Sequence, residues 1–186
     1  MFERLAVTVF PVVFLTVLFG GGALMRRRNI DQDGDPPINR ALFLTSKYLI
    51  VAVWVATVLH GWGIGFSLLK GPTPLKWIAL GLWVLGFALL FGGRFGLSES
   101  FRFGSPKEST VLKANGLFRV SRNPMYVGVY ATLLAAVIYT LNPAVFIVTV
   151  FVIAVHHRIA LAEEAYLRTV FGAEYEAYCR RVRRYL

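Results

Sequence analysis

The chain has 186 residues, of which 56% are hydrophobic and 15% aromatic, and its mean hydropathy of +0.60 excludes an ordinary soluble domain of this size. Its net charge of +10 is distributed between long apolar runs, which favours anionic lipid over nucleic acid as the partner of the basic residues. The single cysteine, Cys179, excludes an internal disulfide and a multi-cysteine metal site.

Five apolar segments are candidates to cross a bilayer, which takes roughly 20 residues. We expect the first, at residues 5–25, to be a retained membrane helix, because Arg4 is the only basic residue before it and no small-residue cleavage pattern follows it. A polar loop is expected over residues 26–46. It contains three aspartates but lacks the rest of a calcium-binding loop, so no metal site is predicted. The other spans are predicted at residues 47–69, 75–95, 125–141 and 144–159.

A long polar interval, residues 96–121, leads to a helix start at Asn123 and Pro124. Asparagine is a favoured N-cap because its side-chain oxygen accepts a free N–H of the first turn, and proline suits the first helical position. Arg119 and Arg122 lie beside this start, so the helix N-terminus and the guanidinium groups together suit a carboxylate or a phosphate. The alternative is that Asn123 only caps the helix and the arginines only anchor it at lipid headgroups.

The C-terminal residues 160–186 alternate apolar and charged side chains at helical spacing, which predicts an amphipathic helix with Gly172 as the point of a break. Two arrangements are open for this helix. It folds back as a lid over a bound ligand, or it lies in the headgroup layer with its arginines on anionic lipid.

The basic residues are distributed unequally about the predicted spans. Seventeen of the 20 lysines and arginines fall on one side, which predicts an external N-terminus and a cytoplasmic C-terminus. We therefore expect an all-α integral membrane protein with five transmembrane helices plus a C-terminal amphipathic helix, in a single membrane domain over residues 1–186. Residues 1–95 would form three spans. Residues 96–186 would form a cofactor-binding loop, a helical hairpin and the amphipathic helix.

Glu163 and Glu164 follow the fifth span, where acidic residues are costly unless they are paired or solvated. His156 and His157 precede them. Adjacent histidines point to different sides of a helix, and no third ligand stands at i+4 spacing, so packing at the interface is favoured over a metal site.

Two motifs with defined spacing lie in the second half of the chain. The first is Gly116-x-Phe118-x-x-x-Arg122-Asn123-Pro124-x-Tyr126-x-Gly128, followed by Asn142-Pro143. The second is Glu163-Glu164-x-x-Leu167-x-x-x-Phe171-Gly172-x-x-Tyr175-x-x-Tyr178-x-x-x-Val182. Together they resemble the isoprenylcysteine carboxyl methyltransferase and phospholipid methyltransferase family, whose members are integral-membrane enzymes that use S-adenosylmethionine.

The resemblance implies a methyltransferase that uses S-adenosyl-L-methionine on a lipophilic acceptor, such as an isoprenylcysteine carboxylate or a phospholipid amine. It places the protein among membrane lipids of the bacterial inner membrane. The distribution of the basic residues predicts that the active site faces the cytoplasm. The resemblance implies catalytic roles for Arg158 and Glu164. Arg122 would suit the cofactor carboxylate, and Glu163 its amine or ribose hydroxyls. The residues expected to bind the cofactor are Thr110, Val111, Leu112, Lys113, Gly116, Phe118, Arg122, Asn123, Pro124, Met125, Tyr126 and Glu163.

The chain departs from the eukaryotic family pattern at three positions. Asn123 stands where those members have histidine, and asparagine cannot act as an acid or base. Ile159 stands where they often have an arginine that contacts the substrate, with Arg158 one residue earlier. Phe118 replaces a common tyrosine. Two other functions stay open: an NADPH-dependent membrane reductase of related fold, and a non-catalytic scaffold or small transporter. Few ionisable groups lie at mid-membrane, which argues against transport.

Overall fold

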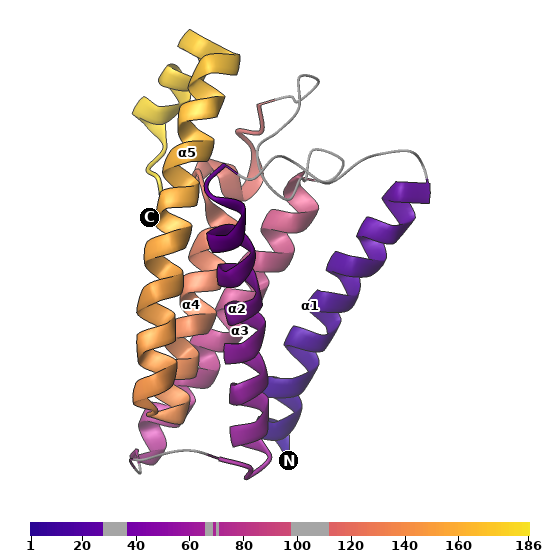
Figure 1. Ribbon diagram of the computed structural model, residues 1–186, viewed down its shortest axis with the longest axis vertical. Helices are drawn as coiled ribbons and strands as arrows, with labels where there is room; N and C mark the ends of the chain where they lie inside the picture. The colour runs from indigo at the N-terminus through magenta and orange to yellow at the C-terminus, as the bar shows by residue number, and fades with distance from the viewer. Residues whose placement is uncertain (28–36, 66–68, 70, 98–111) are drawn as a thin grey trace.

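The computed structural model describes residues 1–27, 37–65, 69, 71–97 and 112–186, with the backbone alone over residues 21–27. The aspartates of the predicted polar loop lie outside these residues. The described parts are all helical and contain no strand. Their helices run up and down as a bundle (Figure 1). The elements are α1 (Phe2–Arg27), α2 (Arg40–Gly61), α3 (Thr73–Leu97), the short 3-10 helix η2 (Gly116–Arg119), α4 (Pro124–Thr140) and α5 (Pro143–Arg181).

Four of the described helices, α1, α2, α3 and α5, are long and apolar enough to cross a membrane, so the chain is an integral membrane protein. Helix α4 is apolar but has only 17 residues. The first, third and fourth predicted spans match α1, α3 and α4 within three residues at each end. The number of spans supported by length is therefore four, and the crossing of α4 stays a prediction.

The second span was predicted too late in the chain. Residues 47–69 were expected, but α2 begins at Arg40 and ends at Gly61. The reason is a cap within the supposed loop, because the Asn39 side-chain oxygen accepts from the N–H groups of Ala41 and Leu42 at 3.0 and 3.2 Å. The other end is set by Gly63, whose φ of 84° does not continue a right-handed helix.

Helix α5 joins two elements that were predicted as separate. It starts at Pro143, one residue before the predicted start, and the side-chain oxygen of its N-cap Asn142 accepts from Ala144 N at 2.8 Å. No break occurs at residue 160, so the amphipathic part continues the span. The break lies at Gly172, as predicted, with φ 48° and ψ −122°. This backbone conformation is strained for residues with a Cβ. Beyond it the chain doubles back along α5 (Figure 1).

The tightest helix contact lies between α3 and α4, the most extensively packed pair of helices among the described residues. A Cβ on Gly86 would lie 2.7 Å from the Thr132 methyl and 2.9 Å from Gly128 O. A Cβ on Gly128 would lie 2.7 Å from Gly86 O. The two glycines therefore permit backbone-to-backbone approach, the usual role of small residues at membrane helix crossings. Trp54 Nε1 donates to Thr132 Oγ1 at 3.1 Å, which adds α2 to the same contact.

A polar cluster ties the helices together at the end of the bundle where α1 begins. Lys76 Nζ lies 2.9 Å from Glu3 Oε1, and the Tyr139 hydroxyl donates to the same carboxylate. The His60 ring meets Tyr139 edge-on, with 5.1 Å between ring centres. This cluster joins α1, α2, α3 and α4 far along the bundle from the motif residues.

Candidate active site

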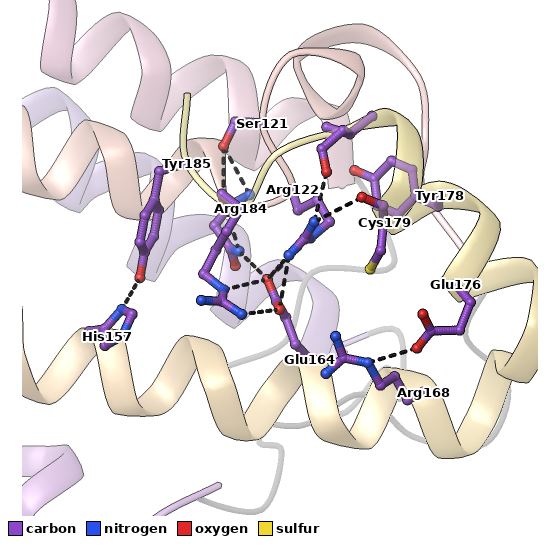
Figure 2. Close-up of polar contacts among 12 residues, drawn as sticks. Ser121, Arg122, His157, Glu164, Arg168, Glu176, Tyr178, Cys179, Arg184 and Tyr185 are labelled. Carbon is purple, nitrogen blue, oxygen red and sulfur yellow. Dashed lines mark hydrogen bonds and ion pairs between the residues drawn. The ribbon is translucent and has the colours of Figure 1, made fainter.

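The motif residues gather at the opposite end, where η2, the start of α4, α5 and the returning C-terminal residues meet (Figure 2). Phe118 is buried in η2, and its carbonyl accepts a hydrogen bond from the Tyr178 hydroxyl at 2.6 Å. Leu112 and Ala114 pack against the buried cluster of Tyr175, Tyr178 and Val182. The returning residues therefore form one wall around the segment that precedes α4.

Glu164 is the centre of this region, and its side chain is 2% exposed. Arg122 donates from Nε to Oε1 at 3.2 Å and from Nη2 to both carboxylate oxygens at 3.0 and 3.1 Å. Arg184 donates from Nε to Oε1 at 3.1 Å and from Nη2 to Oε2 at 3.0 Å. Hydrogen bonding to Glu164 raises the pKa of the Arg184 guanidinium. Two guanidinium groups thus hold one buried carboxylate, which leaves the three side chains with one net positive charge.

Arg122 is also bound to the returning main chain. Its Nη1 donates to Val182 O at 2.7 Å and to Cys179 O at 3.4 Å, and its backbone N–H donates to Arg183 O at 2.9 Å. The Arg122 side chain is only 9% exposed. Its described hydrogen bonds therefore go to the protein itself, and it positions the segment before α4.

Asn123 occupies the N-cap position of α4, and Pro124 is the first helical residue, as predicted. The predicted side-chain cap is wrong, because the Asn123 side chain makes no capping hydrogen bond. Its Nδ2 instead donates to Glu164 Oε1 and to Arg184 O, both at 3.2 Å. The neighbouring carboxylate orients the amide as a donor, which turns it away from the free N–H groups of the first turn.

Glu163 faces different groups from Glu164. The Tyr126 hydroxyl donates to Glu163 Oε2 at 2.9 Å, and the Tyr126 ring meets His156 edge-on, with 5.7 Å between ring centres. The side chains of Glu163 and Tyr126 are both partly exposed. A carboxylate with one such partner keeps further acceptor capacity for a ligand amine or hydroxyl.

The adjacent histidines have different neighbours, as predicted from their spacing. His156 is buried, with Nδ1 3.0 Å from Val152 O on its own helix. His157 Nδ1 lies 2.8 Å from the Tyr185 hydroxyl (Figure 2). The Tyr185 hydroxyl in turn lies 3.4 Å from the Tyr130 hydroxyl. His156 therefore packs against Tyr126 of α4 while its hydrogen bond stays within α5, and His157 links α5 to Tyr185 near the C-terminus.

The remaining predicted residues are placed unevenly. Arg158 is exposed on α5, six positions before Glu164 and about 120° around the helix from it. Met125 packs on the core beside α3. Gly116 begins η2 with a φ of 57°, and Lys113 is half-buried. Thr110 and Val111 lie outside the described residues.

Sequence reasoning missed Ser121, Arg184 and Tyr185. Ser121 is buried, and its hydroxyl donates to Arg184 O at 3.2 Å and accepts from Asn123 N at 3.1 Å. Arg184 is one of four arginines near the C-terminus, which were all offered as contacts for anionic lipid. Composition does not distinguish it from the exposed Arg180, Arg181 and Arg183. Only the reversal of the chain at Gly172 brings Arg184, and not these neighbours, to Glu164.

In the comparison with known families, the sequence model described as phospholipid methyltransferase matches residues 74–174, more than half of the chain. The matched range begins within α3, includes the whole approach to α4, and ends two residues beyond Gly172. Among curated proteins, none matches the chain.

Proposed function

The chain belongs to the phospholipid methyltransferase family, and on that premise we propose that it transfers a methyl group from S-adenosylmethionine to a lipophilic acceptor in the membrane. The observation that supports this most is the meeting of two matched segments about 40 positions apart in sequence. Arg122 and Asn123 bind Glu164, while Tyr126 binds Glu163. Both segments belong to the matched range, and their polar groups face the same region.

The start of α4 is our proposed site for the carboxylate of the cofactor. Because the Asn123 side chain does not cap the helix, first-turn N–H groups are left for a ligand, and the helix dipole favours an anion there. The Arg122 guanidinium contributes positive charge nearby but stays bound to Glu164. Glu163, with the Tyr126 hydroxyl beside it, is our proposed partner for the ligand amine or ribose hydroxyls.

In this proposal the residues of the site act mainly by positioning the cofactor and the acceptor. Bound S-adenosylmethionine supplies the methyl group and a neutral thioether as the leaving group. The protein must hold the acceptor nucleophile in line with that methyl group and exclude water, which accounts for much of the rate enhancement in such transfers. Residues 175–182, with Tyr175, Tyr178 and Val182 buried, form the wall that would exclude water.

Binding of the cofactor tests the proposal. In calorimetry, the purified protein should bind S-adenosylmethionine and should not bind NADPH. Glu163→Gln should weaken binding by about tenfold to a hundredfold, because a charged hydrogen bond is worth about 1.5–3 kcal/mol. Glu176→Gln is the matched control, since Glu176 is 48% exposed and pairs only with Arg168 on the surface among the described contacts.

Other outcomes of this experiment identify the other functions. Binding of NADPH without S-adenosylmethionine would support a reductase. Binding of neither ligand would favour a non-catalytic role. Incorporation of labelled methyl groups into extracted lipids, measured with the same preparation, would then identify the acceptor.

We further propose that the end of the bundle that holds the candidate site lies on the cytoplasmic side of a bacterial inner membrane, because the excess of arginine and lysine lies at that end. A cysteine placed at the exposed Glu174, in a Cys179→Ser background, should react with an impermeant thiol reagent only after the cells are opened. A cysteine at the exposed Pro72, in the same background, should react in intact cells. The reverse pattern would contradict this orientation.

A further inference from the structure

The residues that follow α5 are bonded to three consecutive residues before α4. We call residues 182–185 the return segment. Arg183 O accepts from Arg122 N at 2.9 Å, and Arg184 O accepts from the Ser121 hydroxyl and from Asn123 Nδ2, both at 3.2 Å. Because these bonds go to successive residues, the return segment fixes the path of the chain into α4.

The Arg184 side chain adds a second connection at the same place. Its guanidinium binds Glu164 through two parallel hydrogen bonds of 3.1 and 3.0 Å, on a carboxylate that Arg122 also holds (Figure 2). Arg184 is 32% exposed, whereas Arg122 and Glu164 are 9% and 2% exposed. Arg184 therefore closes the cluster from its outer side.

The main-chain contacts and the side-chain contacts of Arg184 both stabilise the segment before α4. The main chain of Arg184 holds Ser121 and Asn123, while its side chain orients the carboxylate that binds Arg122 and Asn123. A planar guanidinium with two donors sets the rotation of a carboxylate, which a single ammonium donor does less well. The orientation of the Asn123 amide, and with it the uncapped start of α4, depends on this carboxylate.

We propose that Arg184 is a positioning residue of the cofactor site, acting through Glu164 and the turn at Ser121–Asn123 rather than by contact with the cofactor. The inference rests on the proposed function, but its basis is separate, because the family match ends at residue 174. It assigns a role to one of four neighbouring arginines. The exposed Arg181, which ends α5, has no such role and serves as the matched control.

Two measurements on the full-length protein test the proposal. Arg184→Gln should raise amide hydrogen exchange in peptides that cover residues 117–126, in the absence of any ligand, and Arg181→Gln should leave it unchanged. In calorimetry with S-adenosylmethionine, Arg184→Gln should lose at least tenfold in affinity, Arg184→Lys should recover part of that loss, and Arg181→Gln should bind as wild type.

Thermal unfolding of each variant separates positioning from a general loss of fold. A merely structural role would lower the melting temperature and leave the affinity of the folded protein unchanged. Unchanged exchange and unchanged affinity in Arg184→Gln, or in Arg184→Lys if the glutamine variant does not fold, would overturn the inference and leave the proposed function standing. Failure of the wild-type protein to bind S-adenosylmethionine would overturn the proposed function and this role with it.

Discussion

Replacing Glu164 with glutamine is expected to lower the free energy of unfolding by about 3–5 kcal/mol and to remove most of the affinity for S-adenosylmethionine. The physical reason is the charge left behind. Arg122 is 9% exposed, and its compensating carboxylate would be gone. Asn123 and Arg184 would share one neutral amide oxygen in place of a carboxylate, so the connection between the turn before α4 and α5 would weaken. The energy can be measured by denaturant titration of the purified protein in micelles, followed by circular dichroism.

The control for this substitution is Glu3→Gln at the other end of the bundle. Glu3 also binds a cation and a hydroxyl, but the side chains of Lys76 and Glu3 are 44% and 29% exposed. Solvent screens such a pair, so its loss should cost only about 1 kcal/mol or less. Equal effects of the two substitutions would show that Glu164 has no special role in stability.

Replacing Gly128 with valine is expected to destabilise the bundle by about 3 kcal/mol. The first carbon of any side chain there would meet the backbone oxygen of Gly86 at 2.7 Å, and a backbone atom cannot move aside as a flexible side chain can. Helices α3 and α4 would have to separate. Since α4 carries Asn123 and Tyr126 at its start, cofactor affinity should fall as well.

Gly81 on α3 provides the comparison, because a Cβ at that position meets nothing within 4 Å. Gly81→Val should leave the unfolding midpoint close to that of the wild type in the same titration. If Gly128→Val is tolerated equally well, the close crossing of α3 and α4 does not determine the stability of the bundle.

Several elements of the fold could be predicted from the sequence because their signals are local. Length and hydropathy locate α1, α3 and α4, and the Asn142-Pro143 pair marks the start of α5. Helix α2 was placed late because Asn39 stands in a polar stretch, where a cap does not differ from ordinary loop composition. The continuity of α5 beyond residue 160 was missed because its composition changes from apolar to amphipathic while its backbone does not.

For the candidate site, the sequence predicted which residues belong together but not which contacts they make. The resemblance implied that Arg122, Asn123, Glu163 and Glu164 belong to one site, and the structure brings Arg122 and Asn123 to Glu164. Which donor meets which acceptor depends on distances that spacing does not contain. The Asn123 amide turned to Glu164, and Arg184 joined it from 20 positions further along the chain. The first result depends on the packing of α4 against α5, and the second follows from the path of the chain after Gly172.

The uninterrupted course of α5 through residue 160 also determines how deep the site lies. Pro143 and Glu164 are 21 residues apart on one helix, a rise of about 32 Å at about 1.5 Å per residue. The hydrocarbon layer of a bilayer is about 30 Å thick. With Pro143 at one boundary of that layer and the helix near the membrane normal, the carboxylate cluster reaches the opposite boundary, among the headgroups. Under the proposed function, the methyl acceptor at this depth would therefore be a group at the polar end of a lipid, because the middle of an acyl chain lies too deep to reach the site.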